Sequence, residues 1–140
     1  MLHALGGVAA QVLARLPEGK DSAAVIALSG NLGAGKTTFV QALGKALGIP
    51  NTMQSPTYVL MKSYPIAHKQ FTTLVHIDAY RLNSKEEFST LKPETFLSDP
   101  QTIVCIEWPE RVGEALPKPD IQIRFSADGT NEEERYIEVV

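Results

Sequence analysis

The stretch that decides the fold is GNLGAGKT, which runs from Gly30 to Thr37. It matches the pattern G-x-x-x-x-G-K-[ST], in which each fixed position has a physical reason. Glycines allow backbone angles that other residues avoid, so successive amide N–H groups can turn inward as a nest for an anion. The Lys36 ammonium group can reach the β and γ phosphates of a nucleotide, and the Thr37 hydroxyl can bind Mg²⁺. The stretch therefore predicts a loop that holds a nucleoside triphosphate together with Mg²⁺.

The segments on either side of this loop have the character that a phosphate-binding loop needs. Ala23–Ser29 is an apolar run of strand length, which indicates a central strand buried on both faces. Lys36–Leu47 predicts a helix with apolar residues on one face, ended by Gly48 and Pro50. The N-terminus of such a helix favours an anion because its N–H groups are unpaired and its dipole is positive there. This strand–loop–helix order argues against a glycine-rich turn that matches the pattern by accident.

The whole sequence predicts a single α/β domain over residues 1–140, with a mixed, mostly parallel central sheet flanked by helices and a C-terminal hairpin. A short amphipathic helix opens the chain and ends at Pro17, and Ser84 with Glu87 marks the start of a helix of about two turns. Further strand character occurs at 57–64, 71–78, 102–107, 121–125 and 135–139. The first two of these form an antiparallel hairpin or merely lie in one sheet. The last two should pair across a turn at Asp128-Gly129.

Composition limits the classes of protein to consider. The chain has 140 residues, of which 44% are hydrophobic and 21% charged, and this suits one compact globular domain. Its net charge is −3, whereas a domain that binds a nucleic-acid backbone unaided usually carries a basic surplus, so any RNA contact is expected to be indirect or local. The one cysteine excludes an intramolecular disulfide, and the longest apolar run, 23–28, is far too short for a membrane span. We therefore expect a cytoplasmic protein with no membrane contact.

Two acidic residues at the ends of strands are candidates for completing the Mg²⁺ site. Asp78 ends the run 74–78, and Glu107 ends the run 103–107. The carboxyl ends of parallel strands meet at the edge where α/β sheets bind ligands, and a carboxylate there can meet the metal through water. Either acid could instead cap a turn or face solvent, and strand position alone does not choose between these interpretations.

Several other residues have a functional and a structural interpretation. Ser55 and Thr57 lie in SPTY, which is either an ordinary turn before a strand or a switch-like segment that senses the γ-phosphate or its Mg²⁺. Arg81 could stabilise charge on the γ-phosphate or form an ion pair with a nearby acid. His76, within a predicted strand, is expected to hydrogen-bond and orient a neighbour, and Cys105 is expected to pack in the core.

The order and spacing of four segments resemble one known family. The segments are LGAGKTT at 32–38, SPTY at 55–58, HIDAYR at 76–81 and IEW at 106–108. Together they resemble the TsaE family, the small bacterial ATPases of tRNA threonylcarbamoyladenosine biosynthesis. The phosphate loop alone would not distinguish this family from many others, but its combination with H-x-D-x-Y-R, S-P-T-Y and E-W does.

This resemblance implies ATP and Mg²⁺ as cofactors and assigns roles to particular residues. Thr37 and Glu107 would hold Mg²⁺, Asp78 would lie beside the γ-phosphate, and Lys36 would act with the two acids in catalysis. Thr57 would belong to a mobile segment that closes over the nucleotide, and Trp108 would border the site. The nucleotide-binding residues would be Asn31, Leu32, Gly33, Ala34, Gly35, Lys36, Thr37, Thr38 and Trp108.

The resemblance also implies partners. The family works with two proteins, TsaB and TsaD, in a complex that installs threonylcarbamoyl on the adenosine beside the tRNA anticodon. TsaD performs the transfer, and the TsaE family member hydrolyses ATP to keep the complex cycling. Contact with tRNA would then be indirect, through the complex.

Two other classes of protein use the same loop. A small-molecule kinase usually has an arginine-bearing lid over the phosphates, and residues 62–140 offer no arginine-rich segment to build one. A GTP-binding switch usually recognises guanine with an N-K-x-D loop, and that tetrapeptide does not occur in the sequence. The residues therefore favour an ATPase that regulates or resets a partner complex.

Overall fold

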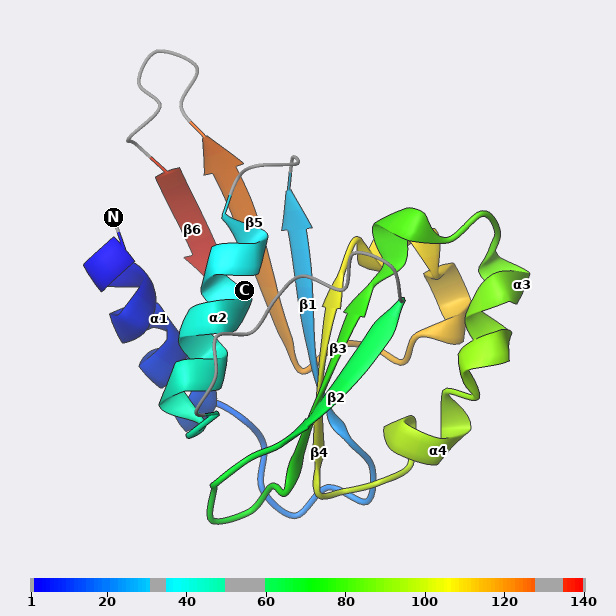
Figure 1. Cartoon of the computed structure of the whole chain (residues 1–140), viewed down its shortest axis with the longest axis horizontal. Helices are drawn as coiled ribbons and strands as arrows, with labels where there is room; N and C mark the ends of the chain where they lie inside the picture. The colour runs from blue at the N-terminus through cyan, green and yellow to red at the C-terminus, as the bar shows by residue number, and fades with distance from the viewer. Residues whose placement is uncertain (1, 31–34, 50–59, 128–134, 140) are drawn as a thin grey trace.

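A six-stranded sheet with helices on both sides forms the body of the protein (Figure 1). The structure is a computed structural model that describes residues 2–30, 35–49, 60–127 and 135–139. The strands are β1 (Ala24–Gly30), β2 (Met61–Pro65), β3 (Thr73–Asp78), β4 (Thr102–Glu107), β5 (Ile121–Ala127) and β6 (Arg135–Val139). Their order across the sheet is β2-β3-β4-β1-β5-β6.

The sheet is parallel in the middle and antiparallel at its two edges. β1 pairs in parallel with β4 and β5, and β4 pairs in parallel with β3. The edge strands β2 and β6 run antiparallel to β3 and β5. The predicted mixed, mostly parallel sheet is therefore confirmed, as are both hairpins. The predicted turn at Asp128-Gly129 lies outside the described residues.

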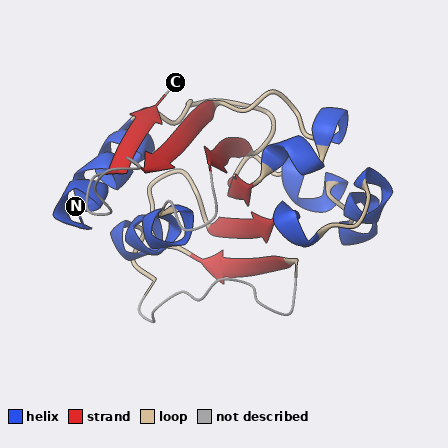
Figure 2. Cartoon of the chain, turned by 90° about the horizontal axis from the view of Figure 1, so that it is seen from above, coloured by secondary structure: helices blue, strands red, loops and turns tan. Residues whose placement is uncertain are grey.

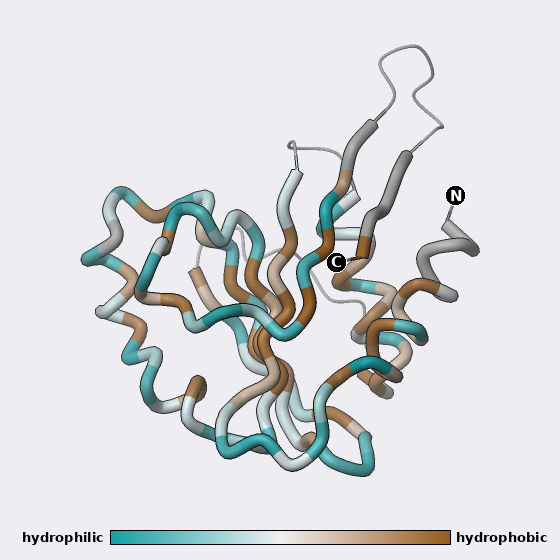
Figure 3. The backbone as a smooth tube through the Cα atoms, turned by 180° about the vertical axis from the view of Figure 1, so that it is seen from behind, coloured by the Kyte–Doolittle hydropathy of each residue, from teal (hydrophilic) through white to brown (hydrophobic). Residues whose placement is uncertain are grey.

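Successive side chains of the central strands point to opposite faces of the sheet and form two hydrophobic layers. In β1, Ile26 and Leu28 pack with the helices α1 (Leu2–Ala14) and α2 (Lys36–Ala46), whereas Val25 and Ala27 face the other layer. Burying a Leu or Ile side chain contributes about 1.5–3 kcal/mol, so a strand that is apolar on both faces needs a cover on each side. Figure 2 shows helices on both sides of the strands, and the tube in Figure 3 is brown where the central strands run.

The second layer is built from short helices. They are α3 (Lys85–Phe88), α4 (Glu94–Leu97) and the 3₁₀ helices η1 (Ala79–Arg81), η2 (Ser89–Leu91), η3 (Pro109–Arg111) and η4 (Gly113–Ala115). Ser84 caps α3 as predicted, since its Oγ accepts from the Glu87 N–H at 3.3 Å. The Glu87 carboxylate accepts from the Asn83 N–H, one residue before the cap. The sequence predicted a helix of about two turns after Ser84. In the structure these are the α-helical turn α3 and the 3₁₀ turn η2.

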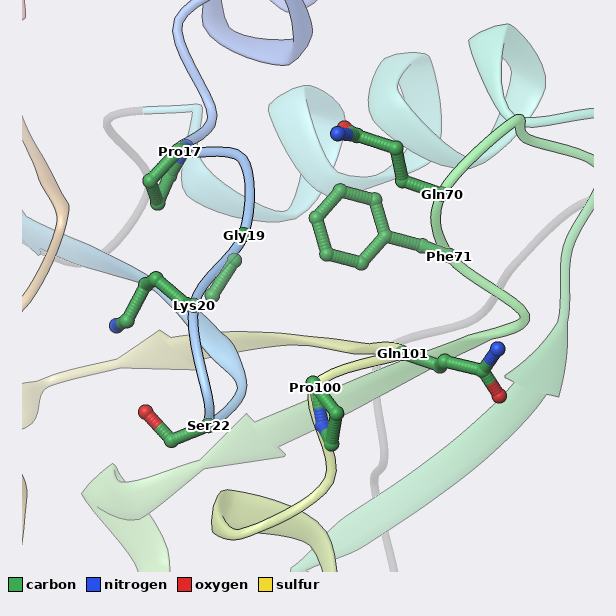
Figure 4. Close-up of a pocket in the computed structure, with 9 residues that line it drawn as sticks. Pro17, Gly19, Lys20, Ser22, Gln70, Phe71, Pro100 and Gln101 are labelled. Carbon is green, nitrogen blue, oxygen red and sulfur yellow. The ribbon is translucent and has the colours of Figure 1, made fainter.

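The amino-terminal edge of the sheet is fastened by charge. The Asp120 carboxylate accepts from the Val25 N–H at 2.7 Å and from the Lys20 ammonium group at 3.0 Å, which ties the start of β1 to the residue before β5. Beside this clamp lies a pocket of about 260 Å³ lined by Pro17, Phe71 and Pro100, among others (Figure 4). Neither feature was predictable from local sequence patterns, because both depend on residues far apart in the chain.

The carboxyl-terminal edge of the sheet gathers the ends of three neighbouring parallel strands. β1 ends at Gly30, β3 at Asp78 and β4 at Glu107, and Asp78 and Glu107 are direct partners in the ladder. The start of α2 lies next to this edge because only residues 31–35 separate it from β1. Within the described ranges, no helix is both long and apolar enough to cross a membrane.

We predict that Gly30→Ala lowers the free energy of unfolding by about 2–4 kcal/mol. Gly30 has a φ of +136°, and a methyl group there would overlap the carbonyl oxygen of Phe125, its partner in β5. Urea unfolding would measure the change. The control is Gly7→Ala in α1, where nothing lies within 4 Å of the new methyl group and a gain of about 0.5–1 kcal/mol is expected. Equal stability of Gly30→Ala and the wild type would contradict this account.

Candidate active site at the carboxyl edge of the sheet

The register of β1, β3 and β4 places the acidic side chains on the face of the sheet that α2 covers. Partner residues of parallel strands point to the same face, and Leu28 is the partner of Glu107. Leu28 belongs to the core cluster beneath α2. Asp78 is the next partner of Glu107, and His76 lies two residues before Asp78, so all three polar side chains share that face. They therefore point toward the layer that holds the N-terminus of α2.

Lys36 is the first residue of α2, and its side chain is buried in the site. Gly35 precedes it with a φ of 103°, which turns the chain into the helix. The Lys36 ammonium group donates to the Gly30 carbonyl oxygen at 2.5 Å and lies 4.2 Å from the centre of the Trp108 ring. Burial lowers the pKa of Lys36, and the negative charges of Glu107, Glu110 and Asp78 oppose that change. The ammonium group is thus poorly hydrated and surrounded by negative charge.

Glu107 is a buried carboxylate with one hydrogen-bond partner among the described residues. Its Oε2 lies 2.6 Å from Nε2 of His76, and the two side chains are only 5% and 1% exposed. The sequence interpretation that His76 orients a neighbour agrees with this geometry.

Asp78 stands at the end of β3 and has a structural contact as well as a place in the site. Its Oδ1 accepts from the Tyr80 N–H at 3.1 Å and so caps η1. Burial, followed by the charge of Glu107, raises the pKa of Asp78, while the Tyr80 N–H, His76 and Arg81 act in the opposite direction. The turn-capping interpretation and the active-site interpretation are therefore compatible for this residue.

Trp108 closes one side of the site. It follows β4 in a left-handed conformation, with a φ of 59°, and its N–H donates to the Leu28 carbonyl oxygen at 3.0 Å. The Tyr80 ring lies 5.1 Å from the Trp108 ring, and the Arg111 guanidinium lies 5.1 Å from the Tyr80 ring. Neither Tyr80 nor Arg111 was predicted from the sequence to have a role in the site. The aromatic residue of H-x-D-x-Y-R was a usable signal for Tyr80, whereas Arg111 offered none.

The other predicted site residues divide into described and undescribed ones. Thr37 and Thr38 are half-buried in the first turn of α2, beside Lys36, and Arg81 is exposed in η1, near enough to Asp78 to lower its pKa. Six further candidates lie outside the described residues: Asn31, Leu32, Gly33, Ala34, Ser55 and Thr57.

The oxygen donors at this edge suit Mg²⁺. Thr37 offers a hydroxyl, Glu107 and Asp78 offer carboxylates, and Mg²⁺ prefers oxygen ligands. Mutual repulsion of the two carboxylates contributes to the raised pKa of Asp78, and a bound cation would relieve that repulsion. The described part of the chain contains no cluster of three or more His, Cys, Asp or Glu side chains arranged for a metal. Mg²⁺ in nucleotide sites needs no such cage, because phosphates and water complete its coordination.

We predict that Asp78→Asn stabilises the protein at pH 7 when nucleotide and divalent cations are removed with EDTA. Because the pKa of Asp78 is higher in the folded protein than in the unfolded chain, its ionised form destabilises the fold. The stability gained by Asp78→Asn should therefore shrink as the pH falls through this pKa toward the ordinary carboxyl range. Thermal unfolding at several pH values would measure it.

The control for this prediction is Asp99→Asn. Asp99 also caps a turn, since it accepts from the Gln101 N–H at 2.9 Å, but it lies at the other end of β4. No comparable gain is expected there. A wild type that is more stable than Asp78→Asn at pH 7 would contradict the prediction.

Comparisons with known proteins identify one family that matches nearly the whole chain. The family model for "Threonylcarbamoyl adenosine biosynthesis protein TsaE" matches residues 4–137. A protein of Treponema pallidum with the name "tRNA threonylcarbamoyladenosine biosynthesis protein TsaE" is 41% identical over 115 residues, which cover 80% of this chain and 81% of that protein. A protein of Streptomyces coelicolor with the same name is 36% identical over 118 residues, covering 82% and 78% of the two chains.

A solved structure has a similar fold. The crystal structure of Bacillus subtilis YdiB superimposes with a TM-score of 0.63 at 26% identity, and the match covers 98% of this chain and 78% of that one. The family model covers nearly the whole chain, and several relatives exceed 30% identity over most of it. The chain therefore belongs to the TsaE family of tRNA threonylcarbamoyladenosine biosynthesis.

Proposed function

We propose that this protein binds ATP with Mg²⁺ at the carboxyl edge of the sheet and hydrolyses it to ADP and phosphate. In this proposal the hydrolysis supports a threonylcarbamoyl-transfer complex with TsaB and TsaD. The observation that carries the proposal is the buried Lys36 ammonium group at the start of α2, with Glu107 and Asp78 on the same face of the sheet. Family membership supports the pathway, and the residues of the site support the reaction.

A polyphosphate would replace weaker contacts of Lys36. The ammonium group donates to a neutral carbonyl oxygen and lies over an aromatic ring. A hydrogen bond from an ammonium group to a phosphate is charge-assisted and about twice as strong as one between neutral groups. The N–H groups of the first turn of α2 have no partners within the helix and favour the same anion. Lys36 would therefore leave the Gly30 carbonyl and bind the β and γ phosphates.

The two acids would take different parts in hydrolysis. Thr37 and Glu107 would hold Mg²⁺, which when bound neutralises charge on the phosphates. Asp78 would orient the attacking water or support the metal. Its side chain, at the end of β3, is only half-buried, whereas the side chain of Glu107 is buried. Arg81, which is exposed and close to Asp78, would be positioned to stabilise charge on the γ-phosphate.

We predict that Lys36→Ala weakens ATP binding by about 10–100-fold, since a hydrogen bond to a charged group contributes about 1.5–3 kcal/mol. Glu107→Ala should retain nucleotide binding in EDTA and lose about 10²-fold in Mg²⁺-dependent hydrolysis. Titration calorimetry and a phosphate-release assay would measure these effects. Lys45→Ala, at the exposed other end of α2, and Glu114→Ala, in η4, are the matched controls.

The same measurements test the proposal as a whole. If neither ATP nor GTP with Mg²⁺ showed saturable binding, the proposal would be refuted. A clear preference for GTP would favour a guanine-nucleotide switch. Phosphate release without an acceptor would distinguish an ATPase from a small-molecule kinase. Normal hydrolysis by Glu107→Ala would make Asp78 the main metal-supporting acid.

We also predict that the isolated protein hydrolyses ATP slowly and that TsaB and TsaD together accelerate it. Phosphoryl transfer depends on the positioning of the reacting groups and on stabilisation of their charge. Tyr80, beside the site, is 43% exposed, so we expect both to be incomplete until a partner covers this edge. Steady-state phosphate release with and without the two partners would measure the acceleration, and a pull-down with and without ATP and Mg²⁺ would test the assembly. Fast turnover by the isolated protein, unchanged on adding both partners, would contradict this prediction.

A further inference from the structure

His76 is the one fully buried polar side chain of β3, and its position is not explained by packing. Its neighbours Leu74, Val75 and Ile77 supply apolar side chains to the two layers. The ladder partner of His76 in β4 is Cys105, which is also buried. An imidazole in such surroundings loses its hydrogen bonds with water, so it needs a hydrogen-bond partner within the protein that compensates for them. That partner is the Glu107 carboxylate of the neighbouring strand, at 2.6 Å.

The direction of this hydrogen bond follows from the chemistry of Glu107. A carboxylate that is to bind a cation is ionised and only accepts hydrogen bonds. Nε2 of His76 therefore carries the proton and donates it to Oε2. The distance is short, as expected when the acceptor is charged, and both side chains are almost completely shielded from water. The bond occupies Oε2, and no donor to Oε1 lies among the described residues, so Oε1 can take another ligand.

Glu107 needs such a restraint. Its side chain has three rotatable bonds, and fixing a flexible glutamate costs up to about 2 kcal/mol in conformational entropy. It also lies beside the negative Asp78, which would repel a carboxylate free to move. Among the described residues, His76 is the only hydrogen-bond donor to Glu107. Removing that donor would leave the buried carboxylate without its hydrogen bond and without a fixed direction.

We propose that His76 is a positioning residue that aims the Glu107 carboxylate at Mg²⁺ in the nucleotide complex. This inference rests on the proposed function, because it concerns the Mg²⁺ that accompanies the nucleotide. His76 acts through Glu107 and does not itself touch the nucleotide or the metal. A histidine that only filled space would show no dependence on the position of its donor atom.

Three substitutions of His76 separate these roles. His76→Gln places an amide N–H₂ near the position of Nε2, so it can still donate to Glu107. His76→Asn is one methylene shorter and places its amide near the position of Nδ1, out of reach of Glu107. His76→Leu retains bulk and removes every donor. The Gln and Asn variants are matched in polarity, so their difference isolates the hydrogen bond.

The experiment is a Mg²⁺ titration read by tryptophan fluorescence. Trp108 is the only tryptophan of the chain and lies 4.2 Å from the Lys36 ammonium group, so its emission should report binding of the phosphates. Each variant is saturated in EDTA-treated buffer with the imido analogue of ATP, which is not hydrolysed, and Mg²⁺ is then added. Circular dichroism and thermal unfolding establish which variants are folded.

The proposal expects a specific pattern. His76→Asn and His76→Leu should raise the half-saturating Mg²⁺ concentration by about 10-fold or more, as loss of a residue that orients a metal ligand usually does. His76→Gln should stay within about 3-fold of the wild type. Affinity for the analogue without Mg²⁺ should be the same in all of them. If His76→Leu does not fold, the comparison of Gln with Asn decides; if Asn does not fold, the comparison of Gln with Leu decides.

Two results would overturn the proposal. One is a folded Asn or Leu variant with the Mg²⁺ dependence of the wild type, and the other is a Gln variant as impaired as the Asn variant. Failure of the proposed function looks different, because the wild type itself would then show no Mg²⁺-dependent signal. That result would overturn both proposals together.

Discussion

The parallel pairing of β1 with β4, and of β4 with β3, is the constraint on which the rest of the structure depends. Parallel strands end at the same edge, and their partner residues share a face, so one register decides the position of every polar group in the site. A shift of one residue in β4 would turn Glu107 to the layer of short helices and bring Trp108 toward α2. The apolar residues before Glu107 prevent that shift, because they fill both hydrophobic layers.

The site is electrostatically costly without a ligand, and its charges are arranged to accept one. Burial lowers the pKa of Lys36 and raises that of Asp78, so both groups are held in surroundings that disfavour their charged forms. Opposite charges within the site offset part of this cost but not all of it. Under the proposed function, the remaining cost would be relieved by a ligand whose negative phosphates lie toward α2 and whose cation lies toward the acids. Such strain at a site, compensated by packing elsewhere, is a common feature of functional centres.

The sequence predicted the parts of this structure that depend on local patterns. Ile26 and Leu28 alternate with Val25 and Ala27 in a run too apolar for an edge strand, so β1 was predictable as a central strand. Glu107 and Asp78 were predictable as residues of the carboxyl edge, since each ends an apolar run. The strand order, the Lys20–Asp120 clamp and the place of Arg111 beside Tyr80 were not, because each depends on contacts between distant segments. The same holds for the identity of the partner that His76 orients.

The surroundings of Cys105 have a practical consequence for labelling. Its side chain is completely buried in β4, and burial, together with the charge of Glu107, raises the pKa of its thiol well above the ordinary value. Thiolate is the reactive form, so this native thiol should be inert toward maleimides while the protein is folded. A cysteine introduced on the surface could then carry a dye in an otherwise unaltered sequence. Distances to a labelled binding partner would become measurable without first removing a core residue.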